Sequence, residues 1–112
     1  MSLSTHVLDT AAGRPAVGVA VRLESQGPGG AWAAVGAGQT DPDGRLRDWL
    51  PAGVPGAGRH RLVFNTGAYF AAAGVASFFP EVTVDFEITA ADEHHHVPLL
   101  LSPFGYSTYK GS

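Results

Sequence analysis

The sequence predicts an all-β protein, a sandwich of seven or eight short strands with one small helix. Glycine and proline are abundant, with 15 and 8 copies among 112 residues, whereas charged residues make up only 15%. This composition is typical of short strands joined by many turns rather than of long helices. Two segments, residues 17–23 and 82–88, also alternate apolar and polar side chains. That two-residue period indicates strands with one buried face.

Weaker signals complete the predicted order of elements. Four further segments, each bounded by glycine, proline, aspartate or asparagine, are expected to be strands: residues 4–9, 32–37, 46–49 and 60–65. The alanine cluster that follows Tyr69 and Phe70 favours a short helix between Gly67 and Gly74. Because so short a helix is marginal alone, we expect it to cap an edge of the neighbouring strands.

The carboxyl-terminal segment predicts a hairpin with little polar surface. Residues 94–101 alternate between a face of Val97, Leu99 and Leu101 and an opposite face of His94, His96, Pro98 and Leu100. Residues 102–105 contain proline and glycine and are expected to form the turn, after which residues 106–111 return as a paired strand. A hairpin that is apolar on both faces is most simply covered by a partner subunit.

Composition excludes several classes of protein. The formal charge is -3 and there is no run of lysine or arginine, so nucleic acid is not an expected partner. The apolar runs are far shorter than the roughly 20 residues that cross a bilayer, so no membrane partner is expected. The chain has no cysteine, which excludes disulfides, a thiol nucleophile and cysteine-ligated metal. Residues 1–112 are expected to form one domain, and the first residues lack a signal-peptide pattern, which favours the cytoplasm.

A histidine pair is the first candidate for chemistry. His94 and His96 are two residues apart on a predicted strand, so both rings project to the same side, about 6 to 7 Å apart, while His95 points away. Two such imidazoles can act as a general base with an acid or orienting partner, or as two metal ligands. The alternative is a solvated, polar end of a strand.

Other candidates lie elsewhere in the chain. His6 is in the first predicted strand, where a single histidine is more often a hydrogen-bonded structural residue, and His60 is expected at the surface. Arg45 directly follows the turn at residues 41–44, where a fixed guanidinium could bind a planar anionic or carbonyl-rich ligand in a bidentate manner. A solvated arginine is the alternative, and Arg47 competes for the same role.

The final residues, 106–112, carry several hydroxyl groups. Terminal segments are usually frayed, but a strand paired with the histidine strand should hold these groups in order near the imidazoles. The sequence has no nucleophile-elbow, metalloprotease or phosphate-binding glycine motif. The usual catalytic motifs therefore leave the chain unassigned.

Four segments together resemble the 5-hydroxyisourate hydrolases, the transthyretin-related enzymes of the ureide pathway. They are LSTHVLDTAAGRPA near the start, TDPDGR in the middle, FFPEVTVDF, and HHHVPLLLSPFGYSTYKGS at the end. The resemblance spans nearly the whole chain. It departs at one position of the family's usual terminal tetrapeptide, Tyr-Arg-Gly-Ser, because Lys110 stands where the arginine is expected.

The resemblance implies a fold, an assembly and a site. The fold would be a transthyretin-like (prealbumin-like) sandwich of two four-stranded sheets with one short helix. The assembly would be a homotetramer with active sites in a channel between subunits. The matching motifs place six residues at the site: His6, Arg45, His94, His96, Tyr109 and Ser112. Of these, Tyr109 would bind substrate, Ser112, His94 and His96 would be catalytic, and His6 and Arg45 would do both.

The reaction implied by the resemblance is hydrolytic opening of 5-hydroxyisourate to 2-oxo-4-hydroxy-4-carboxy-5-ureidoimidazoline, without cofactor or metal. His6 with His96 would activate water, and Arg45 would orient the ring and stabilise the developing oxyanion. Tyr109 and Ser112 would hold polar edges of the substrate or the water. Which histidine is base and which is acid is left open.

Two other functions compete with hydrolysis. A transthyretin-like carrier would use the same sandwich and channel only to hold a small ligand. However, convergent imidazoles and an arginine are costly to bury without a chemical role. A metalloprotein would instead use His6, His94 and His96 as zinc ligands and leave a position open for water.

Overall fold

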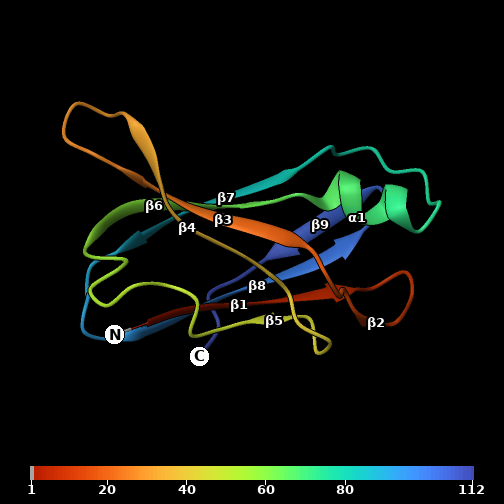
Figure 1. Ribbon diagram of the computed structural model, residues 1–112, viewed down its shortest axis with the longest axis horizontal. Coiled ribbons are helices and arrows are strands. Elements are labelled where there is room, and N and C mark those ends of the chain that lie inside the picture. Colours follow the sequence, from red (N-terminus) through yellow and green to blue (C-terminus); the bar gives the residue numbers. More distant parts are fainter. Residues whose placement is uncertain (1) are drawn as a thin grey trace.

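Two β-sheets enclose the hydrophobic core in the computed structural model, which describes residues 2–112 (Figure 1). The strands are β1 (Ser2–Asp9), β2 (Arg14–Pro15), β3 (Ala20–Gln26), β4 (Trp32–Gln39), β5 (Arg45–Leu46), β6 (Gly58–Phe64), β7 (Val82–Ile88), β8 (His94–Ser102) and β9 (Gly105–Thr108). The first sheet has the order β2-β1-β8-β9, with β5 also paired to β1, and the second has the order β4-β3-β6-β7. Helix α1 (Thr66–Ala72) connects β6 to β7.

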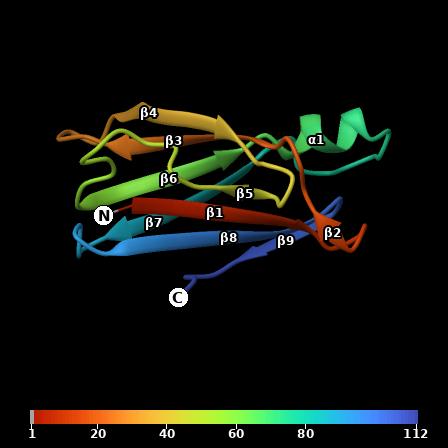
Figure 2. The same ribbon diagram turned by 60° about the horizontal axis from the view of Figure 1, so that its bottom comes forward.

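The pairing of β1 with β8 is parallel, whereas the other strand pairs are antiparallel. It places the first described residues beside a strand near the end of the chain, as the red and blue ribbons of Figure 2 show. In the register of this pair, Ser2 lies opposite His94 and Ser4 lies opposite His96. The two ends of the sequence therefore meet in the middle of the first sheet.

The core is built from alternate residues of both sheets. β1 and β8 contribute Leu3, Val7, Val97, Leu99 and Leu101, and the second sheet contributes Val21, Leu23, Leu62, Phe64, Val82 and Val84. Because successive strand residues point to opposite faces, the polar residues between them on β1 and β8 lie on the outer face of the first sheet. This outer face is where the candidate site forms. No helix in residues 2–112 is long and apolar enough to span a membrane.

The predicted transthyretin-like sandwich with one short helix is confirmed, and strands at residues 82–88 and 94–101 form as expected. The first sheet differs from the four strands expected, because β2 and β5 are two-residue strands that both pair with β1. The strand expected at residues 46–49 is wrong beyond Leu46. There the backbone of Asp48 takes a positive φ of 55°, which a continuing strand does not allow.

Two other boundaries also differ from the expectation. The strand predicted to start at residue 17 begins at Ala20, because Val17 and Gly18 form a turn and Val17 is 51% exposed. β9 ends at Thr108, although the backbone of Gly111 still bridges to His96. Alternation of side chains continues past both boundaries, at the start of β3 and at the end of β9. It therefore does not mark where either strand begins or ends.

His60 was expected at the surface, and this expectation is wrong. The residue is only 4% exposed, and its ring lies beside Phe86. The ring nitrogens are both engaged, Nδ1 with the hydroxyl of Ser25 at 2.7 Å and Nε2 with the carbonyl of Gly56 at 2.8 Å. His60 is therefore a structural residue of the second sheet, satisfied in the way that buried polar groups require.

A hydrogen bond ties the helix to the first sheet. The hydroxyl of Tyr69 donates to the carboxylate of the buried Asp9 at 2.8 Å, and the backbone N–H of Ala12 donates to the other oxygen. Burial, and after it the bond to Asp9, raises the pKa of Tyr69 to about 12. The helix is thus held to the end of β1 as well as by its buried Phe70.

We predict that Tyr69→Phe destabilises the protein by about 1 to 2 kcal/mol, because it leaves Oδ2 of the buried Asp9 carboxylate without its donor. Chemical denaturation at fixed protein concentration measures the free energy of unfolding. Tyr106→Phe is the matched control, since Tyr106 is exposed and packs on Phe79 through its ring. Equal stability of the two variants would contradict the prediction.

Candidate active site

The outer face of the first sheet gathers the predicted site residues. His6 on β1 is paired with Arg45 on β5, and Ser4, two residues before His6, is paired with His96 on β8. His94 follows opposite Ser2. All these residues alternate with core residues of their own strands, so they project from the same face.

A cleft of about 460 Å³ opens on this face. Its lining residues are Ser2, Ser4, Thr5, Arg45, Arg47, Asp48, His94, His96 and Ser112. The structure therefore brings together four of the six predicted site residues, from two strands and the final segment. His6 and Tyr109 do not line the cleft, although His6 is paired with Arg45. Arg47, the alternative to Arg45, lines the same cleft. Both arginines therefore belong to the candidate site.

The turn before Arg45 is fixed by a network of short-range bonds. The carboxylate of Asp41 accepts the backbone N–H groups of Asp43 at 2.8 Å and Arg45 at 2.9 Å, as aspartate does in many turns. The bond from Arg45, chiefly, holds the pKa of Asp41 below its ordinary value. The turn is also bound to β1, since the N–H of Val7 donates to the carbonyl of Gly44 at 2.8 Å.

Gly44 is required at this turn for two reasons. Its φ is +74°, and a Cβ atom would lie 2.5 Å from the carbonyl oxygen of Val7. Either constraint alone disfavours a side chain. This glycine therefore sets how closely the turn approaches β1, and with it the position of Arg45 beside His6.

The ring of His6 is oriented by the same turn. Its Nε2–H donates to the carbonyl of Asp43 at 2.9 Å, which leaves Nδ1 as the nitrogen that can meet a ligand. The residue is half-buried. Although His6 does not line the cleft, its charge is near enough to His96 to influence that ring.

His96 is the most electrostatically constrained imidazole. Burial lowers its pKa, and the positive charges of Arg45, His6 and His94 lower it further. Its Nδ1 lies 2.8 Å from the hydroxyl of Ser4. A neutral imidazole with one nitrogen held and the other available is suited to act as a general base.

The final residues reach the cleft because they are tied to β8. The hydroxyl of Thr108 donates to the carbonyl of Pro98 at 2.7 Å, and the N–H of Gly111 donates to the carbonyl of His96 at 2.8 Å. A Cβ atom on Gly111 would lie 2.6 Å from the ring of His96, so only glycine allows this approach. Ser112 follows directly and lines the cleft.

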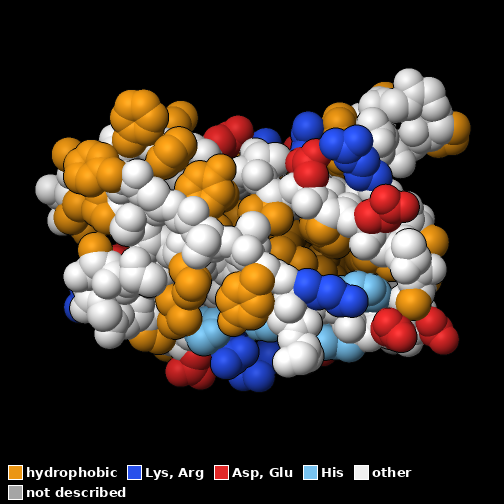
Figure 3. Space-filling model, turned by 180° about the vertical axis from the view of Figure 1, so that it is seen from behind, with side chains coloured by type: hydrophobic (Ala, Val, Ile, Leu, Met, Phe, Trp, Pro, Cys, Tyr) orange, Lys and Arg blue, Asp and Glu red, His pale blue; other side chains and the backbone are white. Residues whose placement is uncertain are grey.

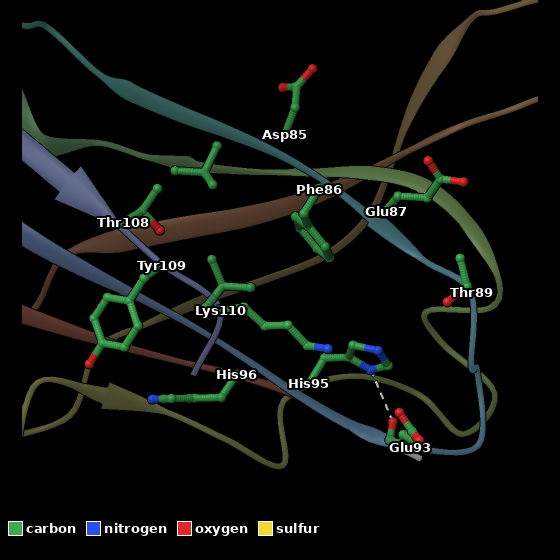
Figure 4. A pocket seen from close by; sticks show the side chains of 12 residues that line it. Asp85, Phe86, Glu87, Thr89, Glu93, His95, His96, Thr108, Tyr109 and Lys110 are labelled. Atoms are coloured by element: carbon green, nitrogen blue, oxygen red, sulfur yellow. Dashed lines mark hydrogen bonds between the residues drawn. The ribbon is translucent and has the colours of Figure 1, made fainter. Parts of the chain in front are cut away.

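Lys110, the departure from the resembled tetrapeptide, lies elsewhere. It lines a second cavity of about 240 Å³ between β7 and the end of the chain, together with Phe86, His95, Tyr109 and also His96, which lines both cavities. Figure 4 shows its side chain extending toward His95 across this cavity. Within one subunit, the exchange of arginine for lysine therefore does not alter the lining of the cleft.

Sequence reasoning missed Ser4 as a member of the site. The only available signal was its position two residues before His6, on the same strand face.

The zinc alternative also lacks support in the geometry. Among residues 2–112, no three histidine, aspartate or glutamate side chains converge as a metal-binding group. The hydroxyl of Ser4 instead lies between the rings of His94 and His96.

The strand order, the helix between β6 and β7 and the cleft on one outer face define a transthyretin-like sandwich with a polar, histidine-lined site. Residues 3–111 match the model of the HIUase/Transthyretin family. The chain belongs to this family, and the resemblance found in the sequence is confirmed.

Three relatives illustrate the range of the family. The 5-hydroxyisourate hydrolase of Salmonella typhimurium is 47% identical over 110 residues, which cover 98% of this chain and 80% of that protein. The structure of Klebsiella pneumoniae 5-hydroxyisourate hydrolase has a TM-score of 0.86 and 40% identity, with both chains fully covered. Sea bream transthyretin in complex with thyroxine has a TM-score of 0.92 but only 31% identity, covering 97% of this chain and 93% of that one.

We predict that Arg45→Met raises the pKa of His96 toward its ordinary value, because it removes a positive charge that disfavours the imidazolium. Burial remains, so the recovery is partial. Titration of the histidine ring signals by NMR measures the shift without need of activity. Arg59→Met, which removes an exposed arginine paired with Asp85 on the second sheet, is the control. An unchanged or lower pKa in Arg45→Met would contradict this electrostatic description.

Proposed function

We propose that this protein is a 5-hydroxyisourate hydrolase that forms 2-oxo-4-hydroxy-4-carboxy-5-ureidoimidazoline in urate degradation. The observation that carries the proposal is the cleft that Arg45 and a half-buried His96 of lowered pKa line together, with His6 paired to Arg45 on the neighbouring strand. Relatives that bear the name 5-hydroxyisourate hydrolase and match this chain over 98% or more of its length support the same activity.

The chemistry of amide hydrolysis assigns a role to each group. A base must take a proton from water, an oxyanion must be stabilised, and the departing ring nitrogen must receive a proton. His96 is the base, because its lowered pKa keeps it neutral near pH 7. Arg45 binds the carbonyl oxygen and bears the developing negative charge. His6 keeps its Nε2–H bond to the carbonyl of Asp43 and, in its doubly protonated form, gives the second proton from Nδ1 to the departing nitrogen, which returns the ring to its neutral form.

Ser112 and Tyr109 complete the proposed site in different ways. Ser112 lines the cleft, where its hydroxyl can hold the attacking water or a polar edge of the ring. Tyr109 is 58% exposed and lies outside the cleft of its own subunit. Its substrate-binding role is therefore a proposal about the assembled channel rather than about one subunit.

A ligand carrier without catalysis is the second candidate, and the likeness to transthyretin favours it. The two functions differ in what they require of the cleft. A carrier needs no base with a lowered pKa and gains nothing from two guanidiniums beside it, whereas both serve a reaction with a developing oxyanion. The donor set of this cleft therefore favours hydrolysis.

We predict that the protein accelerates the decay of 5-hydroxyisourate generated in place by urate oxidase and followed by ultraviolet absorbance. His96→Asn and His6→Asn are each expected to reduce kcat by about 10² to 10⁴-fold, as loss of a general acid or base does. His95→Asn is the matched control, since His95 adjoins His96 in the chain but lines the other cavity.

Three outcomes would count against the proposal. Decay at the spontaneous rate with the unmodified protein would favour the carrier. Full turnover in both His6→Asn and His96→Asn would remove the assigned roles. Loss of activity on chelation, with zinc found in the purified protein, would favour a metal-dependent reaction.

The homotetramer is likewise a proposal, supported by exposed apolar surface. Hydrophobic side chains gather at one end of the face in Figure 3. Among the exposed aromatic residues, Phe78 is 73% and Phe104 is 71% exposed. Apolar surface of this kind is typical of contacts between subunits.

We predict a solution mass of about four times the 11.6 kDa chain mass, measured by light scattering or sedimentation equilibrium. A monomer at micromolar concentration would contradict the tetramer and leave the cleft open to solvent.

The cytoplasmic location and the single domain over residues 1–112 remain parts of the proposal. Cell fractionation tests the first and limited proteolysis the second.

A further inference from the structure

The hydroxyl of Ser4 lies between two imidazoles, and the proposed reaction assigns it no role. It is 3.1 Å from Nε2 of His94 and 2.8 Å from Nδ1 of His96, and Ser4 is only 8% exposed. Beyond it, Nδ1 of His94 bonds to the hydroxyl of Ser2. A continuous chain of hydrogen bonds therefore runs from the cleft base to the exposed His94.

A hydroxyl has one proton, so Ser4 can donate to only one of the two rings and must accept from the other. When Ser4 donates to His94, the Nδ1 of His96 carries a proton and its Nε2 has a free lone pair. When Ser4 donates to His96, the proton of His96 is on Nε2, which then cannot act as a base. The state of Ser4 and the tautomer of His96 are therefore linked.

The two imidazoles differ in how well they hold a positive charge. Around His96 lie His6 from β1, Arg45 and Arg47 from β5 and the segment after it, and the carboxylate of Asp48. A cation there is half-buried among other cations. His94 is exposed, so water can solvate its charged form.

We propose that Ser4 is a positioning residue that joins His96 and His94 into one proton-sharing unit. In the resting state, Ser4 donates to His94 and holds His96 with a proton on Nδ1, so that Nε2 is the base. The inference rests on the proposed function, since it concerns what happens after His96 deprotonates water.

Each step of the exchange is balanced. An O–H bond of water breaks as an N–H bond forms at Nε2 of His96. The Nδ1 proton of His96 then moves to Oγ of Ser4 while the hydroxyl proton of Ser4 moves to Nε2 of His94, which becomes the cation. When a solvent water takes the Nε2 proton of His96, the proton on Nε2 of His94 returns to Ser4 and the hydroxyl proton of Ser4 returns to Nδ1 of His96, which restores the resting state. The positive charge thus resides on the solvated ring of His94 during the reaction.

Ser4→Ala breaks this connection, and Ser4→Thr keeps a hydroxyl in its place. Ser25→Ala is a matched control, because it removes a serine bond of 2.7 Å to Nδ1 of a different histidine, His60, on the second sheet. Circular dichroism and thermal melting establish that each variant is folded.

The first measurement is ring nitrogen NMR of the unmodified protein and the variants across pH. We expect His96 to carry its proton on Nδ1 near neutral pH, and the titrations of His94 and His96 to be coupled. Ser4→Ala should move the His96 proton toward Nε2 and weaken the coupling to the part that the two charges alone produce, whereas Ser4→Thr and Ser25→Ala should not. Undiminished coupling and an unchanged His96 tautomer in Ser4→Ala would overturn the proposal. This readout holds even if the protein does not hydrolyse 5-hydroxyisourate.

The second measurement is turnover with 5-hydroxyisourate. We expect Ser4→Ala to lower kcat by roughly tenfold with little change in KM, since the hydroxyl acts on the base and not on the substrate. Ser4→Thr should restore most of the rate. Full turnover in Ser4→Ala would overturn the role in catalysis, and equal losses in Ser4→Ala and Ser4→Thr would indicate a packing role instead.

Discussion

The parallel pairing of β1 with β8 is the constraint on which the candidate site depends. These strands are far apart in the sequence, and their register sets Ser2 and Ser4 opposite His94 and His96. A slip of one residue would turn the histidines to the core and the valines and leucines to the outer face. The buried Val97, Leu99 and Leu101 forbid that slip, because their burial would be lost with it. The same apolar residues that stabilise the sandwich therefore fix the positions of the imidazoles.

Arg45 depends on a second constraint, the turn that precedes it. Asp41 organises the turn through backbone bonds, and Gly44 brings it close enough to β1 for a bond to Val7. Since the carbonyl of Asp43 also orients the ring of His6, one turn positions both the guanidinium and an imidazole. The β5 strand is only two residues long, yet this is enough to hold Arg45 in register with His6.

The cleft gathers positive charge and one half-buried base. Desolvation, and after it the charges of Arg45, His6 and His94, disfavours the charged form of His96, which favours a neutral base and also makes the protonated ring costly during a reaction. The hydrogen-bonded path through Ser4 would lower that cost, because it lets the positive charge move to the exposed imidazole of His94. The features that distinguish this site from a simple ligand channel are thus electrostatic, and they arise from side chains that the sandwich fold itself does not require.

The sequence by itself determined the class of fold, most strand positions, the helix and the residue types of the site. Alternation at residues 82–88 and 94–101 has one physical cause, the burial of one face of a strand, and it needs no knowledge of distant contacts. Tertiary structure decided what no local pattern contains: the short β2 and β5 strands, which exist only because β1 lies beside them, and the burial of His60. It also decided that Ser4 lies between two histidines, which depends on the pairing of β1 with β8, and that Lys110 faces a different cavity, which depends on how the last residues pack beside β7 and β8.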